Sequence, residues 1–192
     1  MTLSPDERDR VRRMLPVPGR RAVAARGLLR ELLGSELGLP PAEVPLRAGG
    51  QGKPYVEGPL RFNAAHTGDL AVFVFTDGRE VGVDIERLRA LEDAEALAAE
   101  LLTPVEQEAL WSLPAAARDA AFLETWTRKE AYLKGCGHGL HVSPRAVVVS
   151  VLPSEPPALL GVRGQPGEPA RWSLHRLSLA PGHVGTLAIE AL

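Results

Sequence analysis

The sequence predicts an α+β protein whose two similar halves meet near residue 90 and are related by a pseudo-twofold axis. Two helix starts of one kind support this prediction: Ser4–Glu7 and Thr103–Glu106 each carry a hydroxyl, a proline and a glutamate in the order of a capping box. In each half a proline break, a longer helix, a glycine stop and strands then follow in that order. Residues 66–72 also resemble residues 183–189. The alternative is chance similarity, because helices that begin with proline are common.

Helices and strands alternate along the N-terminal half, residues 1–90. Apolar residues between Val23 and Leu37 recur at three- and four-residue spacing, which predicts one buried helix face. The dipeptide Asp77–Gly78 is a hairpin signal between two apolar strands. The expected elements are a short helix from Ser4 that ends at the proline break of residues 16–19, a longer helix over 20–37 that stops at Gly38, a loop-rich stretch over 44–60, and hairpin strands over 70–76 and 80–86.

The strand over residues 80–86 carries the first sign of chemistry. Its apolar residues point to one side, while Gly82, Asp84 and Glu86 point to the other. Two carboxylates so close repel each other unless a positive group joins them, and Mg²⁺ prefers carboxylate oxygens, phosphates and water. The alternative is a strand end with two solvated acids, which a single Asp-x-Glu usually is.

The C-terminal half, residues 91–192, carries the second sign of chemistry on a long helix. Trp126, Glu130 and Lys134 fall on one stripe at four-residue spacing, and the stripe continues the apolar side of the helix. Glu130 and Lys134 either form a surface ion pair or are partly buried as part of a site. In the second case Glu130 would add a third carboxylate to a metal cage. The expected elements are helices over residues 91–102, 103–113 and 116–134, and strands over 147–151, 171–179 and 185–191.

Composition and charge limit the class of protein. With 45% hydrophobic and 24% charged residues, the chain of 192 residues can bury a core. The formal net charge of -2 argues against a general nucleic-acid binder. The single cysteine, Cys136, excludes an intramolecular disulfide and a cysteine-based zinc cluster. With no apolar run typical of a signal peptide or a membrane helix, we expect a cytoplasmic protein that binds neither nucleic acid nor membrane.

Three motifs in this order, Phe62–Gly68, Gly82–Glu86 and Trp126–Lys134, resemble the 4′-phosphopantetheinyl transferase superfamily. The resemblance covers most of the chain and is closer to the surfactin-synthetase-activating type, a fused pseudo-dimer, than to the short trimeric holo-acyl-carrier-protein synthases. It implies an enzyme that moves 4′-phosphopantetheine from coenzyme A to a serine of an apo acyl or peptidyl carrier protein and releases adenosine 3′,5′-bisphosphate. It also implies an active site at the interface of the two halves, in a protein that acts as a monomer.

The resemblance implies roles for individual residues. Mg²⁺ would be held by Asp84, Glu86 and Glu130, with Glu130 also accepting the serine proton. Lys134 would stabilise the leaving phosphate, and His66 would contact the phosphates of coenzyme A. Further contacts with coenzyme A are expected from Arg10, Arg21, Lys53, Ala65 and Lys129. For the glycine-rich segment around Lys53, the residues alone favour a hairpin turn with an exposed lysine over an anion-binding loop.

Two departures from the family pattern and two alternatives accompany this resemblance. The extra N-terminal strand that family members usually carry is not expected here. Ala65 stands where family members usually have serine, so a hydroxyl contact is lost while the backbone groups stay available. The first alternative is a non-catalytic relative that binds coenzyme A or a carrier protein. The second is a metal-dependent phosphohydrolase, which would normally need more His and Asp ligands. The carrier, from fatty-acid, polyketide or peptide synthesis, is not named by the sequence, and its docking surface is expected around residues 111–122.

Overall fold

The computed structural model describes residues 2–3, 7, 16–49, 52–137 and 142–192. The chain divides into two compact units, Met1–Arg47 and Ala48–Leu192. This boundary differs from the one expected at residue 90, which falls inside the larger unit, so the division into two similar halves stays a prediction. In the described ranges, no helix is long and apolar enough to span a membrane.

The main element of the first unit is helix α2 (Pro16–Leu37), which the 3-10 turn η1 (Pro41–Glu43) follows. The expected proline break over residues 16–19 is wrong, because α2 begins at Pro16 and includes Pro18 in its first turn. Proline is tolerated there, since the first N–H groups of a helix have no intrahelical acceptor. The expected stop is confirmed: α2 ends at Leu37, and Gly38 has a φ of 67°. The helix expected from Ser4 lies outside the described residues, apart from Glu7.

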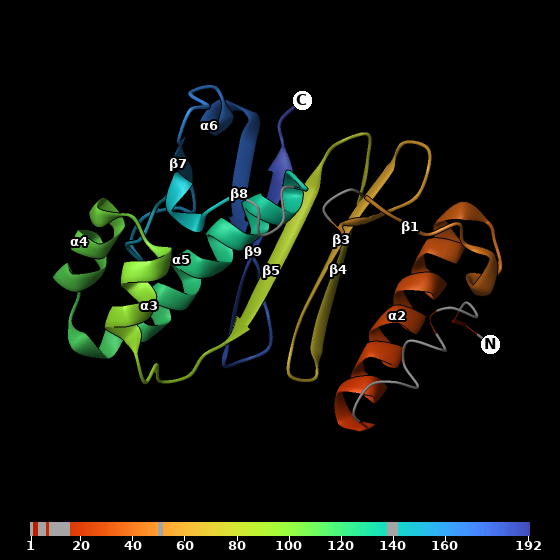
Figure 1. The fold of residues 1–192 in the computed structure, drawn as a ribbon, viewed down its shortest axis with the longest axis horizontal. Helices are drawn as coiled ribbons and strands as arrows, with labels where there is room; N and C mark the ends of the chain where they lie inside the picture. Colours follow the sequence, from red (N-terminus) through yellow and green to blue (C-terminus); the bar gives the residue numbers. More distant parts are fainter. Residues whose placement is uncertain (1, 4–6, 8–15, 50–51, 138–141) are drawn as a thin grey trace. The chain divides into compact units, whose positions relative to one another are not determined.

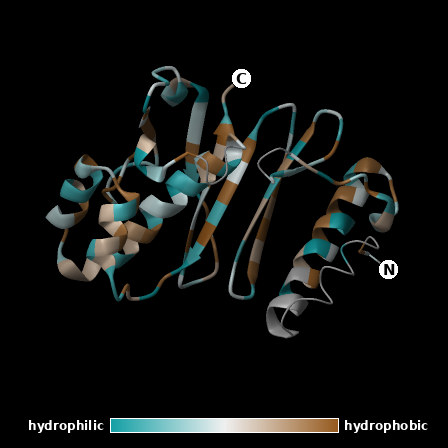
Figure 2. Ribbon diagram, viewed as in Figure 1, coloured by the Kyte–Doolittle hydropathy of each residue, from teal (hydrophilic) through white to brown (hydrophobic). Residues whose placement is uncertain are grey.

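Only part of the predicted apolar face of α2 is buried. Leu29 and Leu33, one turn apart, are buried, whereas Leu28 is 45% exposed. Along the coloured part of α2 in Figure 2, hydrophobic and hydrophilic residues alternate, as expected of a helix with one covered side.

The second unit contains the strands and helices that carry the candidate site (Figure 1). Strand β1 (Arg47–Ala48) lies at the boundary of the two units. The other elements are, in order, β2 (Pro54–Tyr55), β3 (Leu60–Thr67), β4 (Leu70–Asp77), β5 (Val81–Arg87), α3 (Ala94–Leu101), α4 (Pro104–Ser112), α5 (Ala115–Gly135), η3 (Pro144–Ala146), β6 (Val147–Val149), β7 (Leu159–Val162), α6 (Glu168–Arg171), β8 (Trp172–Arg176) and β9 (His183–Glu190).

The pairing of the strands differs from the expected hairpin between β4 and β5. Strand β4 pairs antiparallel with β3, through a turn at Gly68 with a φ of 58°, while β5 pairs antiparallel with β9 in a sheet of order β5-β9-β8. The turn after β4 is tied back to the chain before β3, because Gly78 N donates to the Pro59 carbonyl at 2.9 Å. This bond continues the β3–β4 ladder by one pair, and Gly78, with a φ of 71°, lies in the turn that leads to β5.

Strand β5 has an apolar side and a polar side, as predicted. Val83 and Ile85 are buried in a cluster with Ala65 of β3. The backbone N–H of Val83 donates to Oδ1 of the buried Asn63 at 3.0 Å, so a side chain of β3 links the two strands. Figure 2 shows the resulting alternation of hydropathy along β5.

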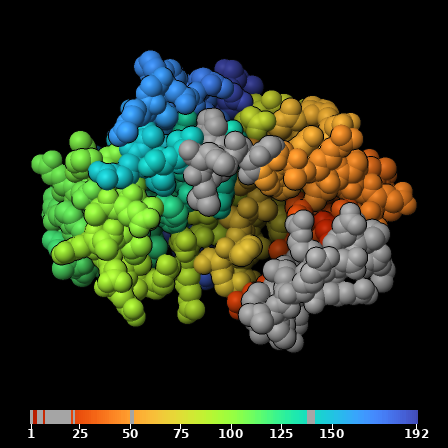
Figure 3. Space-filling model, in the orientation of Figure 1, coloured from red at the N-terminus to blue at the C-terminus, as the bar shows by residue number. Residues whose placement is uncertain are grey.

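Helix α5 covers the other side of the β5-β9-β8 sheet (Figure 1). Its C-terminal half packs into the main core, where Tyr132 meets Trp172 of β8 edge to face with 5.5 Å between ring centroids. Its N-terminal half packs against α3 and α4. The capping box predicted at Thr103–Glu106 is confirmed and begins α4. In Figure 3, α3 and α4 (green) lie beside the segment that includes β6 (cyan).

The proposed internal repeat receives no support from the two similar segments. Residues 66–72 end one strand, turn at Gly68 and begin the next, whereas residues 183–189 lie inside the single strand β9. Gly185 is therefore a strand residue, and its position corresponds to a turn in the other segment. The pseudo-twofold relation stays a prediction.

Candidate active site

Strand β5 and helix α5 approach most closely at Gly82. A Cβ atom on Gly82 would lie 2.0 Å from the carbonyl oxygen of Ala131 and 2.3 Å from the backbone nitrogen of Gly135, so only glycine fits. Because side chains alternate along a strand, the acidic side of β5 also faces α5. This close approach brings the two carboxylates of the strand to the helix that bears Glu130 and Lys134.

The centre of the site is an ion pair between Asp84 and Lys134. Lys134 Nζ donates to Asp84 Oδ1 at 2.5 Å. Asp84 is 7% exposed, and its burial raises the pKa of the carboxyl from 3.8 to about 6. Lys134 opposes this rise in pKa, whereas the negative charges of Glu130 and Glu86 add to it. The ionised form of Asp84 therefore depends on a nearby cation.

Glu130 and Glu86 complete the cluster of carboxylates. Burial raises the pKa of Glu130; Lys134 opposes that rise, and Glu86 adds to it. Glu86 is partly exposed and pairs with Arg89, whose Nη1 lies 3.3 Å from Glu86 Oε2. The structure thus brings together the strand acids and the helix acid that the sequence predicted as one cluster.

The arrangement of these carboxylates is only partly that of a metal site. In residues 52–137 and the other described ranges, no group of three or more His, Cys, Asp or Glu side chains is placed to hold a metal ion. Asp84 Oδ2, however, is a buried oxygen with no hydrogen-bond partner among the described residues. A buried carboxylate oxygen is costly without a partner, and a hard cation such as Mg²⁺ is a partner of the right chemistry. Asp84 Oδ2 is therefore a candidate ligand for Mg²⁺, although the carboxylates around it do not form a complete metal cage.

Lys129 is engaged inside the protein, which does not favour its predicted contact with coenzyme A. Its side chain is completely buried, and its Nζ lies 2.6 Å from Glu106 Oε2. The same Nζ donates to the carbonyl oxygens of Pro144 at 3.0 Å and Val147 at 2.6 Å. With all three hydrogens of the ammonium engaged inside the protein, Lys129 links α5 to α4 and β6.

Lys53 is also engaged by the protein. Its Nζ lies 2.8 Å from Glu80 Oε2 and donates to the carbonyl oxygens of Gly135 at 2.8 Å and Val81 at 3.2 Å. Arg61 binds the other oxygen of Glu80, with 2.9 Å between Nε and Oε1. The expected hairpin is confirmed, because β1 pairs with β2 and Gly49 N donates to the Lys53 carbonyl at 2.9 Å, but the expected exposure of the lysine is wrong.

The remaining predicted contacts with coenzyme A lie at several places. Ala65 is buried against β5, while His66, the next residue of β3, is exposed. Arg21 is an exposed residue of α2 in the first unit, and Arg10 lies outside the described residues.

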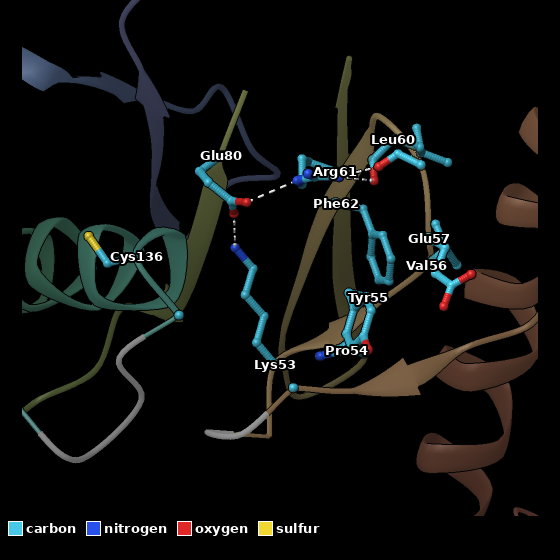
Figure 4. Close-up of a pocket in the computed structure, with 13 residues that line it drawn as sticks. Lys53, Pro54, Tyr55, Val56, Glu57, Leu60, Arg61, Phe62, Glu80 and Cys136 are labelled. Carbon is cyan, nitrogen blue, oxygen red and sulfur yellow. Dashed lines mark hydrogen bonds and ion pairs between the residues drawn. The ribbon is translucent and has the colours of Figure 1, made fainter. Parts of the chain in front are cut away.

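A cavity of about 510 Å³ lies beside the C-terminal end of α5 (Figure 4). Its wall includes the rings of Tyr55 and Phe62 and the side chains of Lys53, Glu80 and Cys136. Burial raises the pKa of the Cys136 thiol to about 11, so the thiol stays protonated at neutral pH. The cavity therefore presents apolar surface next to an ion-paired lysine.

The sequence interpretation missed the roles of three polar residues in and around the site. Glu80 holds Lys53, and Thr186 lies opposite Asp84 in the β5–β9 ladder with its hydroxyl 3.0 Å from that of Thr127 on α5. Glu106 was recognised only as a helix cap, although it also binds Lys129. The roles of Glu80 and Thr186 depend on neighbours that are distant in the sequence, so no local pattern predicts them. For Glu106, the capping motif predicts a helix start but not the ion pair with Lys129.

The fold and the site define a class of protein: an α+β protein in which an acidic strand faces a helix with a glutamate and a lysine one turn apart. Comparison with known proteins agrees. Residues 80–188 match the family described as the 4′-phosphopantetheinyl transferase superfamily. The chain belongs to this superfamily.

Two relatives found by sequence support the same assignment. The chain is 38% identical to 4′-phosphopantetheinyl transferase HetI of Nostoc sp. over 82% of this chain and 69% of HetI. It is 31% identical to 4′-phosphopantetheinyl transferase psf-1 of Bacillus pumilus over 65% of this chain and 53% of psf-1, so it spans about half the length of that relative. Among solved structures, the holo-[acyl-carrier-protein] synthase of Neisseria meningitidis is 18% identical, with a TM-score of 0.47 over 59% of this chain and 98% of that chain.

Proposed function

We propose that this chain is a 4′-phosphopantetheinyl transferase that uses coenzyme A and an apo carrier protein. In the reaction the serine hydroxyl of the carrier attacks the phosphorus atom that bears pantetheine. The bond from that phosphorus to the bridging oxygen breaks, and adenosine 3′,5′-bisphosphate leaves. The serine proton must pass to a base, and the charge on the leaving phosphate must be neutralised.

The single observation that carries this proposal is the Asp84–Lys134 ion pair, which lies beside Glu130 on the face of α5 that meets β5. Glu130 is the candidate base, because burial raises the pKa of its carboxyl and makes it a better proton acceptor. Lys134 is one-third exposed and keeps hydrogens available for an oxygen of the leaving phosphate. His66, exposed at the end of β3, is proposed to contact the phosphates of coenzyme A.

We also propose that the site takes Mg²⁺, held by Asp84, Glu86 and Glu130. The unpaired Oδ2 of Asp84 and the repulsion among the three carboxylates support this proposal. When bound, Mg²⁺ would neutralise charge on the diphosphate of coenzyme A. On the resemblance alone, we further propose that the protein acts in the cytoplasm as a monomer.

The test is to incubate the chain with apo carrier proteins of fatty-acid, polyketide and peptide synthases, coenzyme A and Mg²⁺, and to weigh the carriers. We expect a mass gain of one phosphopantetheine on at least one carrier. Glu130→Gln should abolish the gain without a change in circular dichroism. Binding of coenzyme A or carrier with no mass gain on any of them would favour the non-catalytic alternative.

A further inference from the structure

The ammonium group of Lys53 has three hydrogens, and the structure supplies three acceptors for them. These are Glu80 Oε2 at 2.8 Å, Gly135 O at 2.8 Å and Val81 O at 3.2 Å. The side chain of Lys53 is 18% exposed, although one side of it borders the cavity. A phosphate could bind this nitrogen only by displacing a protein acceptor, so the geometry favours a role within the protein.

The two carbonyl acceptors lie where β5 and α5 meet. Val81 begins β5, and Gly135 ends α5. The last carbonyls of a helix have no intrahelical donor, and a cation there also interacts favourably with the helix dipole. Lys53 therefore ties the end of the helix to the start of the strand, next to the close approach of Gly82 and Gly135.

The two carbonyls that Lys53 binds, those of Val81 and Gly135, lie close in sequence to Asp84 and Lys134. Lys134 precedes Gly135 on α5, and Asp84 follows Val81 by three positions on β5. A small slide of α5 along β5 would separate Lys134 Nζ from Asp84 Oδ1, which are 2.5 Å apart. The Lys53 side chain is in turn oriented by its ion pair with Glu80.

Glu80 is itself oriented by a second cation. Its Oε2 accepts from Lys53, while its Oε1 accepts from Arg61 Nε at 2.9 Å. Figure 4 shows the side chains of Lys53 and Arg61 both directed at this carboxylate. Arg61 also donates to the Gly58 carbonyl at 2.6 Å, which fixes the guanidinium to the chain before β3.

We propose that Lys53 is a positioning residue that, together with Glu80, holds the C-terminal end of α5 on β5 and so keeps Lys134 on Asp84. This inference deepens the proposed transferase function and rests on it for its kinetic consequence. It differs from a direct contact between Lys53 and coenzyme A. If Lys53 contacted coenzyme A directly, its loss would mainly raise KM for coenzyme A. If Lys53 positions α5, its loss would mainly lower kcat.

Steady-state kinetics on the full chain separate the two roles. We expect Lys53→Ala to lower kcat about tenfold, the scale of one charged hydrogen bond, with KM for coenzyme A changed less than about twofold. Lys53→Arg should recover most of kcat, because its guanidinium can reach both a carboxylate and a carbonyl. Arg163→Ala, which removes an exposed cation after β7, is the control and should match the wild type. A raised KM at unchanged kcat would overturn the proposal.

Amide hydrogen exchange tests the same contact without turnover. The Cys136 N–H donates to the Tyr132 carbonyl at 2.9 Å, in the last turn of α5. Lys53→Ala should speed its exchange about tenfold, and Lys53→Arg should restore slow exchange. If the wild-type chain transfers nothing, the proposed function fails, while this exchange still decides whether Lys53 holds the helix: unchanged exchange overturns the inference.

A second variant covers the case in which Lys53→Ala does not fold. Glu80→Gln removes the charge that orients Lys53 but leaves both carbonyl acceptors in place. We expect it to speed exchange of the Cys136 amide about threefold, less than the loss of the ammonium itself. No change in that exchange rate would also overturn the proposal.

Discussion

Replacing Asp84 by asparagine tests whether this buried carboxylate is strained when no metal is bound. Burial raises its pKa from 3.8 to about 6 in the folded chain. At 1.36 kcal/mol for each pH unit, ionisation of Asp84 costs the fold on the order of 3 kcal/mol. Between pH 3.8 and about 6 the folded chain binds more protons at this group than the unfolded chain does. The free energy of unfolding should therefore fall as the pH rises through that window.

Asparagine keeps the size of the side chain but has no proton to lose. In metal-free buffer, Asp84→Asn and the wild type should have similar stability near pH 4. At pH 8 the variant should be more stable, by up to about 3 kcal/mol, because the partly exposed Lys134 can turn to water. Urea unfolding at a series of pH values with EDTA measures the difference. A difference that is the same at pH 4 and pH 8 would refute the reasoning.

Added Mg²⁺ extends this experiment to the metal proposal. A ligand that binds only the folded state stabilises it by mass action. Mg²⁺ at pH 8 should therefore raise the stability of the wild type and have little effect on Asp84→Asn. Equal stabilisation of both proteins would argue that Asp84 is not a ligand.

Two further substitutions test the packing that builds the site. Gly82→Ala should destabilise the chain by about 3 kcal/mol or more and abolish transfer, because its Cβ would overlap the backbone of α5. Thermal unfolding measures the loss of stability. The control is Gly161→Ala, whose added Cβ would meet nothing nearer than 4.0 Å. Lys129→Met should cost about 3–5 kcal/mol in urea unfolding, because it leaves Glu106 buried without its cation. Adding Glu106→Gln to Lys129→Met should recover part of that loss; no recovery would show that the ion pair is not the source of the cost.

The superfamily and the residues of the central cluster could be predicted from the sequence, because short motifs and local periodicity carry them. The alternation along β5 placed Asp84 and Glu86 on one side, and the structure confirms that side as the one facing α5. The helical repeat also indicates the directions of the two lysines on α5. Five residues separate Lys129 from Lys134, which is about 140° around a helix, so the two lysines cannot point into the same site.

Strand pairing could not be predicted from local signals. Asp77–Gly78 has the composition of a hairpin turn, yet β5 pairs with β9, about 100 residues later in the chain. Which strand becomes the neighbour depends on how whole surfaces are buried, and a dipeptide contains no information about that.

The sequence by itself determined the local elements: the capping box of α4, the extent of α5 and the order of acidic and apolar residues on β5. These features depend on hydrogen bonds and side-chain spacing within a few residues. Only the tertiary structure decided the partners of the charged groups. In the structure Lys129 is buried and pairs with Glu106, Lys53 binds the last carbonyl of α5, and Lys134 pairs with Asp84. The physical reason is that a buried charge requires a partner, and which partner lies within reach is decided by the packing of distant elements.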